Sequence, residues 1–190
     1  MEDKLASCRT LPTLPGAAIR LIEVAQSPDA DVASAVAVIS LDPALSAKIL
    51  RLANSPLYAT QRRVDNLRQA LTLLGLNTTL NLALGFSLVG ALRTDGASAA
   101  LNERLWRRSI LASIACRTLG NMLRLPRTDE LMLAGLMQDV GMLALGKLDP
   151  EGYAARVEAS ADPADQCRRE VEAYGIDHAA AGACLARHWS

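Results

Sequence analysis

The sequence predicts an all-α protein, and three observations support this. Hydrophobic residues make up 51% of the 190 residues but aromatic residues only 3%, so the core must be mainly aliphatic. Alanine and leucine dominate the composition, and both favour helix. No segment shows sustained alternation of apolar and polar residues, and none has a hairpin signal. A chain of this length fits one domain, with room for two lobes and a sizeable core.

Capping residues place the helices in the first half of the chain. Asp31, Asp42 and Asn66 are residue types that often cap a helix N-terminus, and Pro43 suits the first helical position after Asp42. Apolar residues follow these caps at helical spacing. The helices expected here cover residues 16–26, 31–40, 42–54, 66–75 and 77–92.

The second half of the chain is predicted to form further helices separated by short polar stretches. The segment 93–100, RTDGASAA, is small, polar and unpatterned, so we expect a boundary between two lobes there. The lobes are predicted to be residues 1–95 and 96–190. The helices expected here cover residues 101–123, 128 or 129 to 145, 162–174 and 177–189, with a short one that starts at Asp149-Pro150.

The stretch Leu131–Leu145, LMLAGLMQDVGMLAL, is predicted to be the central helix of the fold. Apart from two glycines, its only residues that are not apolar are Gln138 and Asp139. A helix that is apolar on all sides is usually buried, and an ionised carboxylate is costly to bury without a partner. Asp139 is therefore expected to pair with a cation, to bind a metal, or to cap a break in the helix near Gly141.

The bulk composition argues against several classes of protein. Lys+Arg and Asp+Glu are 20 each, and the Arg pairs are scattered, so we expect no nucleic acid held by bulk electrostatics. The uninterrupted apolar run 82–92 is too short to cross a bilayer, so no membrane segment is expected. Without a C-x-x-C pair or a signal-peptide pattern, the four cysteines are expected to be reduced thiols of a cytoplasmic protein that binds no cofactor. These four are Cys8, Cys116, Cys167 and Cys184.

Several segments, in order along the chain, resemble the HDOD domain family. The N-terminal lobe of that family is similar to LPTLPGAAIRLIEVAQSPDA, ISLDPALSAKILRLANSPLY and VDNLRQALTLLGLNTTLNLAL, and its C-terminal lobe to AGLMQDVGMLAL and YGIDHAAAGACLARHW. The resemblance implies a two-lobed all-helical domain, with a five-helix N-terminal lobe and a C-terminal lobe like the HD phosphohydrolases. It also implies a bacterial signalling-output domain that generally lacks their metal site. The family usually continues beyond the position of Trp189, so we expect this chain to be a piece of a longer protein.

The resemblance also indicates a degenerate metal site. The His-Asp pair that binds metal in HD phosphohydrolases corresponds here to Gln138-Asp139, and the histidine of their W-x-H-S segment corresponds to Arg108. A glutamine is a weak ligand, and arginine stays protonated and cannot bind a metal. We therefore expect no metal and no catalytic residue, with Arg108 paired to Asp139 in place of the metal. In the alternative, Arg108 points to solvent and Asp139 accepts backbone N–H groups near Gly141.

Two further groups of residues are candidates for function. His178 completes the predicted degenerate pocket, although the capping residue Asp177 predicts that it is simply a first-turn histidine. His178 and His188 lie ten residues apart on one expected helix, so they cannot share a metal. The second group, Asn54, Ser55, Pro56 and Tyr58, either ends a helix through local hydrogen bonds or forms a surface that partners contact.

Three functions follow from these observations. The first is a non-catalytic regulatory module that contacts other signalling proteins and controls motility, virulence or another bacterial behaviour. The second is a divergent metal-dependent phosphohydrolase, with a rearranged site built on Asp139 and His178. The third is a domain that senses a nucleotide such as a cyclic dinucleotide, with Arg108 binding phosphate.

Overall fold

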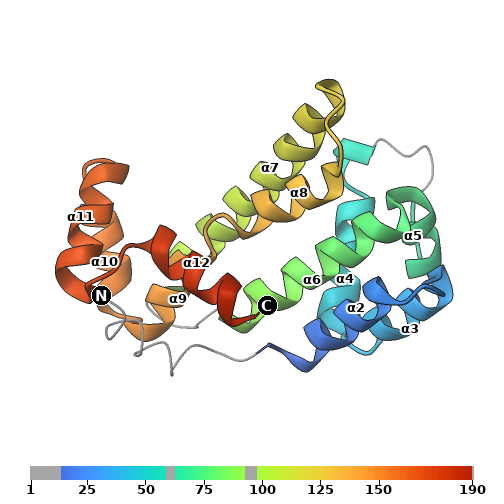
Figure 1. Ribbon diagram of the computed structural model, residues 1–190, viewed down its shortest axis with the longest axis horizontal. Coiled ribbons are helices and arrows are strands. Elements are labelled where there is room, and N and C mark those ends of the chain that lie inside the picture. The colour runs from blue at the N-terminus through green and yellow to red at the C-terminus, as the bar shows by residue number, and fades with distance from the viewer. Residues whose placement is uncertain (1–13, 59–62, 93–97, 190) are drawn as a thin grey trace.

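The computed structural model describes residues 14–58, 63–92 and 98–189, and these residues form helices without a strand (Figure 1). The expected all-α architecture is confirmed. In Figure 1 the helices α2 to α5 lie on one side and α9 to α12 on the other, with α6, α7 and α8 between them. The helices are α2 (Gly16–Gln26), α3 (Val32–Ser40), α4 (Pro43–Ala53), η2 (Pro56–Tyr58), α5 (Leu67–Leu74), α6 (Leu76–Leu92), α7 (Ala99–Met122), α8 (Thr128–Met137), α9 (Val140–Leu148), α10 (Gly152–Ala159), α11 (Pro163–Tyr174) and α12 (His178–His188).

The capping residues act as the sequence predicts. Asp31 forms a capping box with Ser34, and the Asp42 carboxylate accepts hydrogen bonds from the first turn of α4. Asn66 caps α5, and Asp177 caps α12 by accepting from the Ala180 N–H. Each of these caps satisfies N–H groups that a helix leaves without an intrahelical partner.

The central helix expected over residues 131–145 is divided by a break, which was one of the outcomes left open for Asp139, although the Asp139 side chain does not cap the second part. Helix α8 ends at Met137 and α9 begins at Val140, with Gln138 and Asp139 in a turn between them. The turn places the Asp139 carboxylate beside Arg108, so the charge does not lie unpaired inside an apolar helix interface. The short helix expected from Asp149 starts later, at Gly152, whose N–H donates to the Asp149 carboxylate.

Two clusters of buried apolar side chains form the core. The first joins α2 to α6 and includes Leu136 of α8, whereas the second joins the end of α6 to α7, α9, α10 and α12. Helix α6 belongs to both, with Phe86 in the first cluster and Leu92 in the second. The core is therefore continuous through α6. The lobe boundary expected near residue 95 lies in segment 93–97, outside the described residues, and stays a prediction.

In the described chain, the segment 128–148 has the length and hydropathy of a membrane span, and α5 and α6 pass the same test together but are bent by 113° at the break between them. Within segment 128–148, 61% of the most apolar window is buried inside the protein, and the turn at Gln138 and Asp139 divides it. Such burial is typical of a core helix, whose apolar surface faces other helices. Cys116 and Cys167 are free thiols, as expected, and Cys8 lies outside the described residues. The cytoplasmic location stays a prediction.

Candidate functional site

Arg108 and Asp139 form an ion pair between α7 and the turn that separates α8 from α9. The Arg108 Nε lies 2.6 Å from the Asp139 Oδ2, and another guanidinium nitrogen lies 3.1 Å from the Met142 sulfur. The Asp139 side chain is 10% exposed, whereas that of Arg108 is 53% exposed. A permanent cation that reaches in from the surface therefore compensates a nearly buried carboxylate. Of the two arrangements that the sequence left open for Arg108, the structure has the ion pair.

Gln138 contributes to the same site. Its side-chain N–H group points to the Asp139 Oδ2 at 3.4 Å, so both neighbours of this carboxylate present hydrogen-bond donors to it. A divalent metal requires lone pairs from its ligands, and arginine has none to offer. The donor set of Arg108, Gln138 and Asp139 therefore does not fit a metal ion. Their assignment as a former metal site stays a prediction.

The His178 ring takes part in a different contact. Its Nδ1 lies 2.6 Å from the Glu170 Oε2, and its backbone N–H donates to the same oxygen at 2.8 Å. The His178 backbone does lie beside the turn, because its carbonyl oxygen packs against Gly141. The structure thus brings Arg108, Gln138 and Asp139 together and directs the His178 ring to a second network.

Glu170 is the centre of this second network, and the sequence analysis missed it. It is 1% exposed, and its carboxylate accepts hydrogen bonds from the Tyr153 hydroxyl and the Gln166 amide, both at 2.8 Å. Burial acts to raise the pKa of Glu170, but the hydrogen bonds from Gln166, His178 and Tyr153 outweigh it and the pKa is lowered. Burial and the neighbouring carboxylate raise the pKa of Tyr153. Glu170 therefore ties α10, α11 and α12 together.

One group of side chains in the described residues combines the donor types of a metal site. The ligand atoms of Cys167, Glu170 and His178 all lie within 4.8 Å of one another. Burial, with the charges of Asp177 and Glu170, raises the pKa of the Cys167 thiol, which favours its protonated form. Because the Glu170 oxygens already accept hydrogen bonds from their neighbours, the network accounts for this cluster without a metal.

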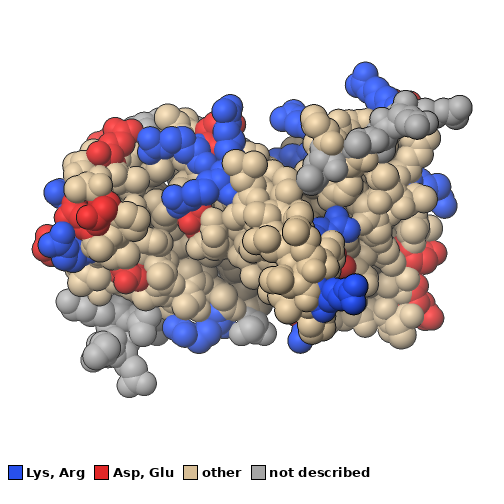
Figure 2. Space-filling view, turned by 90° about the horizontal axis from the view of Figure 1, so that it is seen from above, with Lys and Arg blue, Asp and Glu red and all other residues tan. Residues whose placement is uncertain are grey.

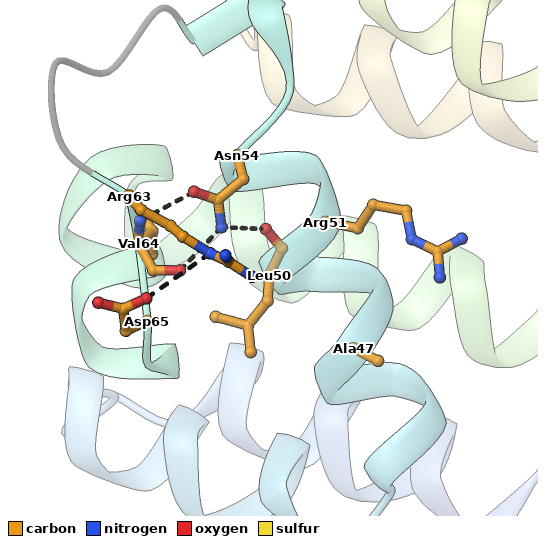
Figure 3. Close-up of a pocket in the computed structure, with 7 residues that line it drawn as sticks. All are labelled: Ala47, Leu50, Arg51, Asn54, Arg63, Val64 and Asp65. Atoms are coloured by element: carbon orange, nitrogen blue, oxygen red, sulfur yellow. Dashed lines mark hydrogen bonds and ion pairs between the residues drawn. The ribbon is translucent and has the colours of Figure 1, made fainter.

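The four residues of the second candidate group, Asn54, Ser55, Pro56 and Tyr58, have different roles. Figure 3 shows the Asn54 side chain between α4 and the segment that follows it: its amide donates to the Leu50 and Val64 carbonyls, and its oxygen accepts from the Val64 N–H at 2.8 Å. The sequence left open whether Asn54 ends a helix through local hydrogen bonds or belongs to a partner surface. These bonds give it the first role. The Tyr58 hydroxyl accepts from Arg117 of α7 at 2.9 Å. Pro56 is exposed and begins η2, and the hydroxyl of Ser55 is buried without a partner in the described residues.

With this fold and site in view, a comparison with protein-family models matches residues 11–190 to the HDOD domain. The chain belongs to the HDOD family. A solved HDOD domain protein of unknown function from Geobacter sulfurreducens shares the fold with a TM-score of 0.77 and 23% identity, over 99% of this chain and 65% of that one. A crystal structure from Shewanella amazonensis, provisionally described as a phosphohydrolase, has a TM-score of 0.76 and 30% identity, over 98% of this chain and 66% of that one.

An uncharacterised protein of Treponema pallidum is 24% identical over 188 residues, which cover 95% of this HDOD chain and 35% of that protein. The chain therefore spans about a third of this curated relative's length and just under two thirds of each of the two solved chains. The activities of those longer proteins are not transferred to it by the match.

The surface charge of the HDOD chain agrees with its neutral composition. Figure 2 shows Lys and Arg interspersed with Asp and Glu at both sides of one face, and a mostly uncharged area in the middle. The formal net charge is zero. A face of this kind has no continuous basic stripe to follow a nucleic-acid backbone.

Proposed function

We propose that this chain is a non-catalytic regulatory module of bacterial signalling that acts by contacting other proteins. The observation that carries the proposal is the 2.6 Å contact between Arg108 and Asp139. In the HD phosphohydrolases that the family resembles, a metal bound at this place activates water for attack on a phosphoester. Here a guanidinium holds the carboxylate, and a guanidinium has no lone pair with which to bind a metal, so it cannot supply metal-activated water.

An exposed apolar surface at the end of the α7–α8 hairpin supports contact with a partner protein. Met122 is 74% exposed, Leu123 68% and Leu119 55%, and Leu125 follows them in the turn. The hairpin projects from the rest of the molecule in Figure 1. Neighbouring exposed apolar side chains are typical of protein-interaction sites. We call Leu119, Met122, Leu123 and Leu125 the hairpin surface.

Leu123→Glu should abolish capture of the partner without unfolding the protein, because the side chain is exposed and surface changes usually cost within about 0.5 kcal/mol. The test is a pull-down from the native host with the full-length protein, read by mass spectrometry. Val171→Glu is a matched control, because Val171 is 48% exposed on α11, away from the hairpin surface. The proposal predicts a protein retained by the wild type and by Val171→Glu but lost with Leu123→Glu. Equal retention by all three would contradict a role for the hairpin surface.

A divergent phosphohydrolase is the second candidate, and the Shewanella relative's description is the observation that favours it. Its test is turnover of a chromogenic phosphodiester and of cyclic dinucleotides with added Mn²⁺. Turnover that disappears in Asp139→Asn would establish this function in place of the regulatory one. A nucleotide sensor using Arg108 is less favoured, since two nitrogens of that guanidinium already contact Asp139 and Met142.

A further inference from the structure

A half-open pocket lies between α4 and α7, with α6 beneath it. Its volume is about 440 Å³, within the range of small-molecule sites in proteins. The buried Phe86 ring lies 5.0 Å from the Trp106 ring, centroid to centroid, and Ile110 continues the apolar wall along α7. The interior of the pocket is therefore suited to an apolar group.

The rim of this pocket carries more positive than negative charge. Lys48, Arg51 and Arg107 all line it, and Glu103 is the acidic residue among its lining residues. Glu103 is bound to Arg107 at 3.0 Å, and the Lys48 Nζ lies 5.0 Å from the Trp106 ring. In a chain with zero net charge, this local excess of cations favours an anion at the mouth of the pocket.

Arg51 is placed to serve the pocket. Figure 3 shows its side chain extended away from Asn54 and Asp65, which bond to other groups on the opposite side of α4. The Arg51 side chain is exposed at the surface, and it takes no part in the hydrogen bonds that hold Asn54. It is therefore available to an anion at the mouth of the pocket.

Ser55 belongs to the same lining, but its hydroxyl does not add to the case for a ligand. The Ser55 Oγ is inaccessible to solvent and has no hydrogen-bond partner in the described part of the chain. Because a water-sized probe does not reach this oxygen, a ligand in the pocket does not reach it either. The inference therefore rests on the apolar walls and the cationic rim.

We propose that this pocket binds a small amphipathic organic anion, with its apolar body against Phe86, Trp106 and Ile110 and its anionic group near Arg51. A nucleotide fits less well, because its base and ribose need several fixed polar partners, and Ser55 is the uncharged polar residue among the lining residues. A partner helix would need a long groove rather than a compact pocket. The site is separate from the Arg108–Asp139 pair, so it stands or falls independently of the proposed regulatory role.

The two tryptophans provide the test, because each lines a different apolar pocket. Trp106 lines the proposed site, whereas Trp189 lines a second pocket, of about 500 Å³, beside Met137 and Ala183. The chain contains two tryptophans, so Trp189→Phe leaves Trp106 as the sole tryptophan and Trp106→Phe leaves Trp189, and either can be excited selectively over the tyrosines. Decanoate is the probe, and decanol is its uncharged control. We expect saturable quenching or enhancement of Trp106 fluorescence by decanoate, with decanol binding more weakly.

Charge variants test the cationic rim of the site, in the Trp189→Phe background. Arg51→Gln should weaken decanoate binding about three- to fivefold, as expected for an exposed charge, and leave decanol binding unchanged. Arg104→Gln is the matched control, since Arg104 is an exposed arginine on α7 outside the pocket lining. Equal affinity for decanoate and decanol, a response carried by Trp189, an unchanged affinity in Arg51→Gln, or no saturation would each overturn the proposal.

Discussion

Gly141→Ala is expected to destabilise the protein by about 3 kcal/mol or more, at the upper end of the usual cost of overpacking. A Cβ added to Gly141 would overlap the His178 carbonyl oxygen and lie 2.6 Å from the Gly182 backbone nitrogen. Both neighbours are backbone atoms of α12, so they cannot move aside as a flexible side chain would. The helices α9 and α12 must separate, and they carry much of the second core cluster.

Gly182→Ala is the matched control for this prediction, because the two glycines face each other across the same interface. A Cβ added to Gly182 would meet the Gly141 nitrogen at 3.4 Å, an ordinary contact. An alanine is also better than a glycine inside a helix by roughly 1 kcal/mol. Urea unfolding should therefore show a large loss for Gly141→Ala and little or no loss for Gly182→Ala. Equal effects would show that α9 and α12 do not approach this closely.

Glu170→Ala is expected to cost about 2–4 kcal/mol, because it leaves several buried or partly buried donors without an acceptor. The Tyr153 hydroxyl is the most affected, since Tyr153 is fully buried and donates to Glu170 at 2.8 Å. The Gln166 amide and the His178 backbone N–H lose the same partner. Urea unfolding monitored by circular dichroism measures the loss. Glu172→Ala is the control, because Glu172 is exposed on the same helix. A cost for Glu170→Ala no larger than that control would show that the network does not stabilise the fold.

Glu170 should also make stability depend on pH. The pKa of Glu170 is lowered in the folded protein from an ordinary value of 4.5. Its contribution to the free energy of unfolding is therefore complete above about pH 4.5 and is lost as the pH falls through the folded pKa. Glu170→Gln removes this titration. The difference in unfolding free energy between the wild type and Glu170→Gln should therefore be constant near neutral pH and shrink below about pH 4.5. A difference that grows as the pH falls would mean that the pKa of Glu170 is raised instead.

The parts of the fold that the sequence predicts correctly depend on neighbouring residues. Asp31, Asp42 and Asn66 cap helices through bonds to residues two or three positions away, so a local pattern is sufficient to find them. The break at Gln138 and Asp139 was one of three outcomes left open for Asp139. The choice among them depends on Arg108, 31 residues away, which local periodicity does not report.

The Arg108–Asp139 pair and the network around Glu170 differ in whether the sequence could predict them. The Arg108–Asp139 pair was predictable because the family resemblance aligns both residues with known metal-ligand positions. Glu170 had no such guide: its partners Tyr153 and His178 are 17 and 8 residues away, and a glutamate on an amphipathic helix is usually exposed. The sequence signal for it was absent, since only the packing of α10 and α12 against α11 makes it buried. For the same reason, His178 was grouped with Asp139 although its ring contacts Glu170.

Calorimetric titration of metal-stripped protein with Mn²⁺ tests most directly whether the Arg108 guanidinium has replaced the metal. Arg108→His/Gln138→His provides the positive control, because it supplies imidazole nitrogens at both positions that now present donors to Asp139. The account predicts no stoichiometric binding by the wild type and a gain of binding by the double variant. Binding of one Mn²⁺ per chain by the wild type, lost in Asp139→Asn, would contradict it.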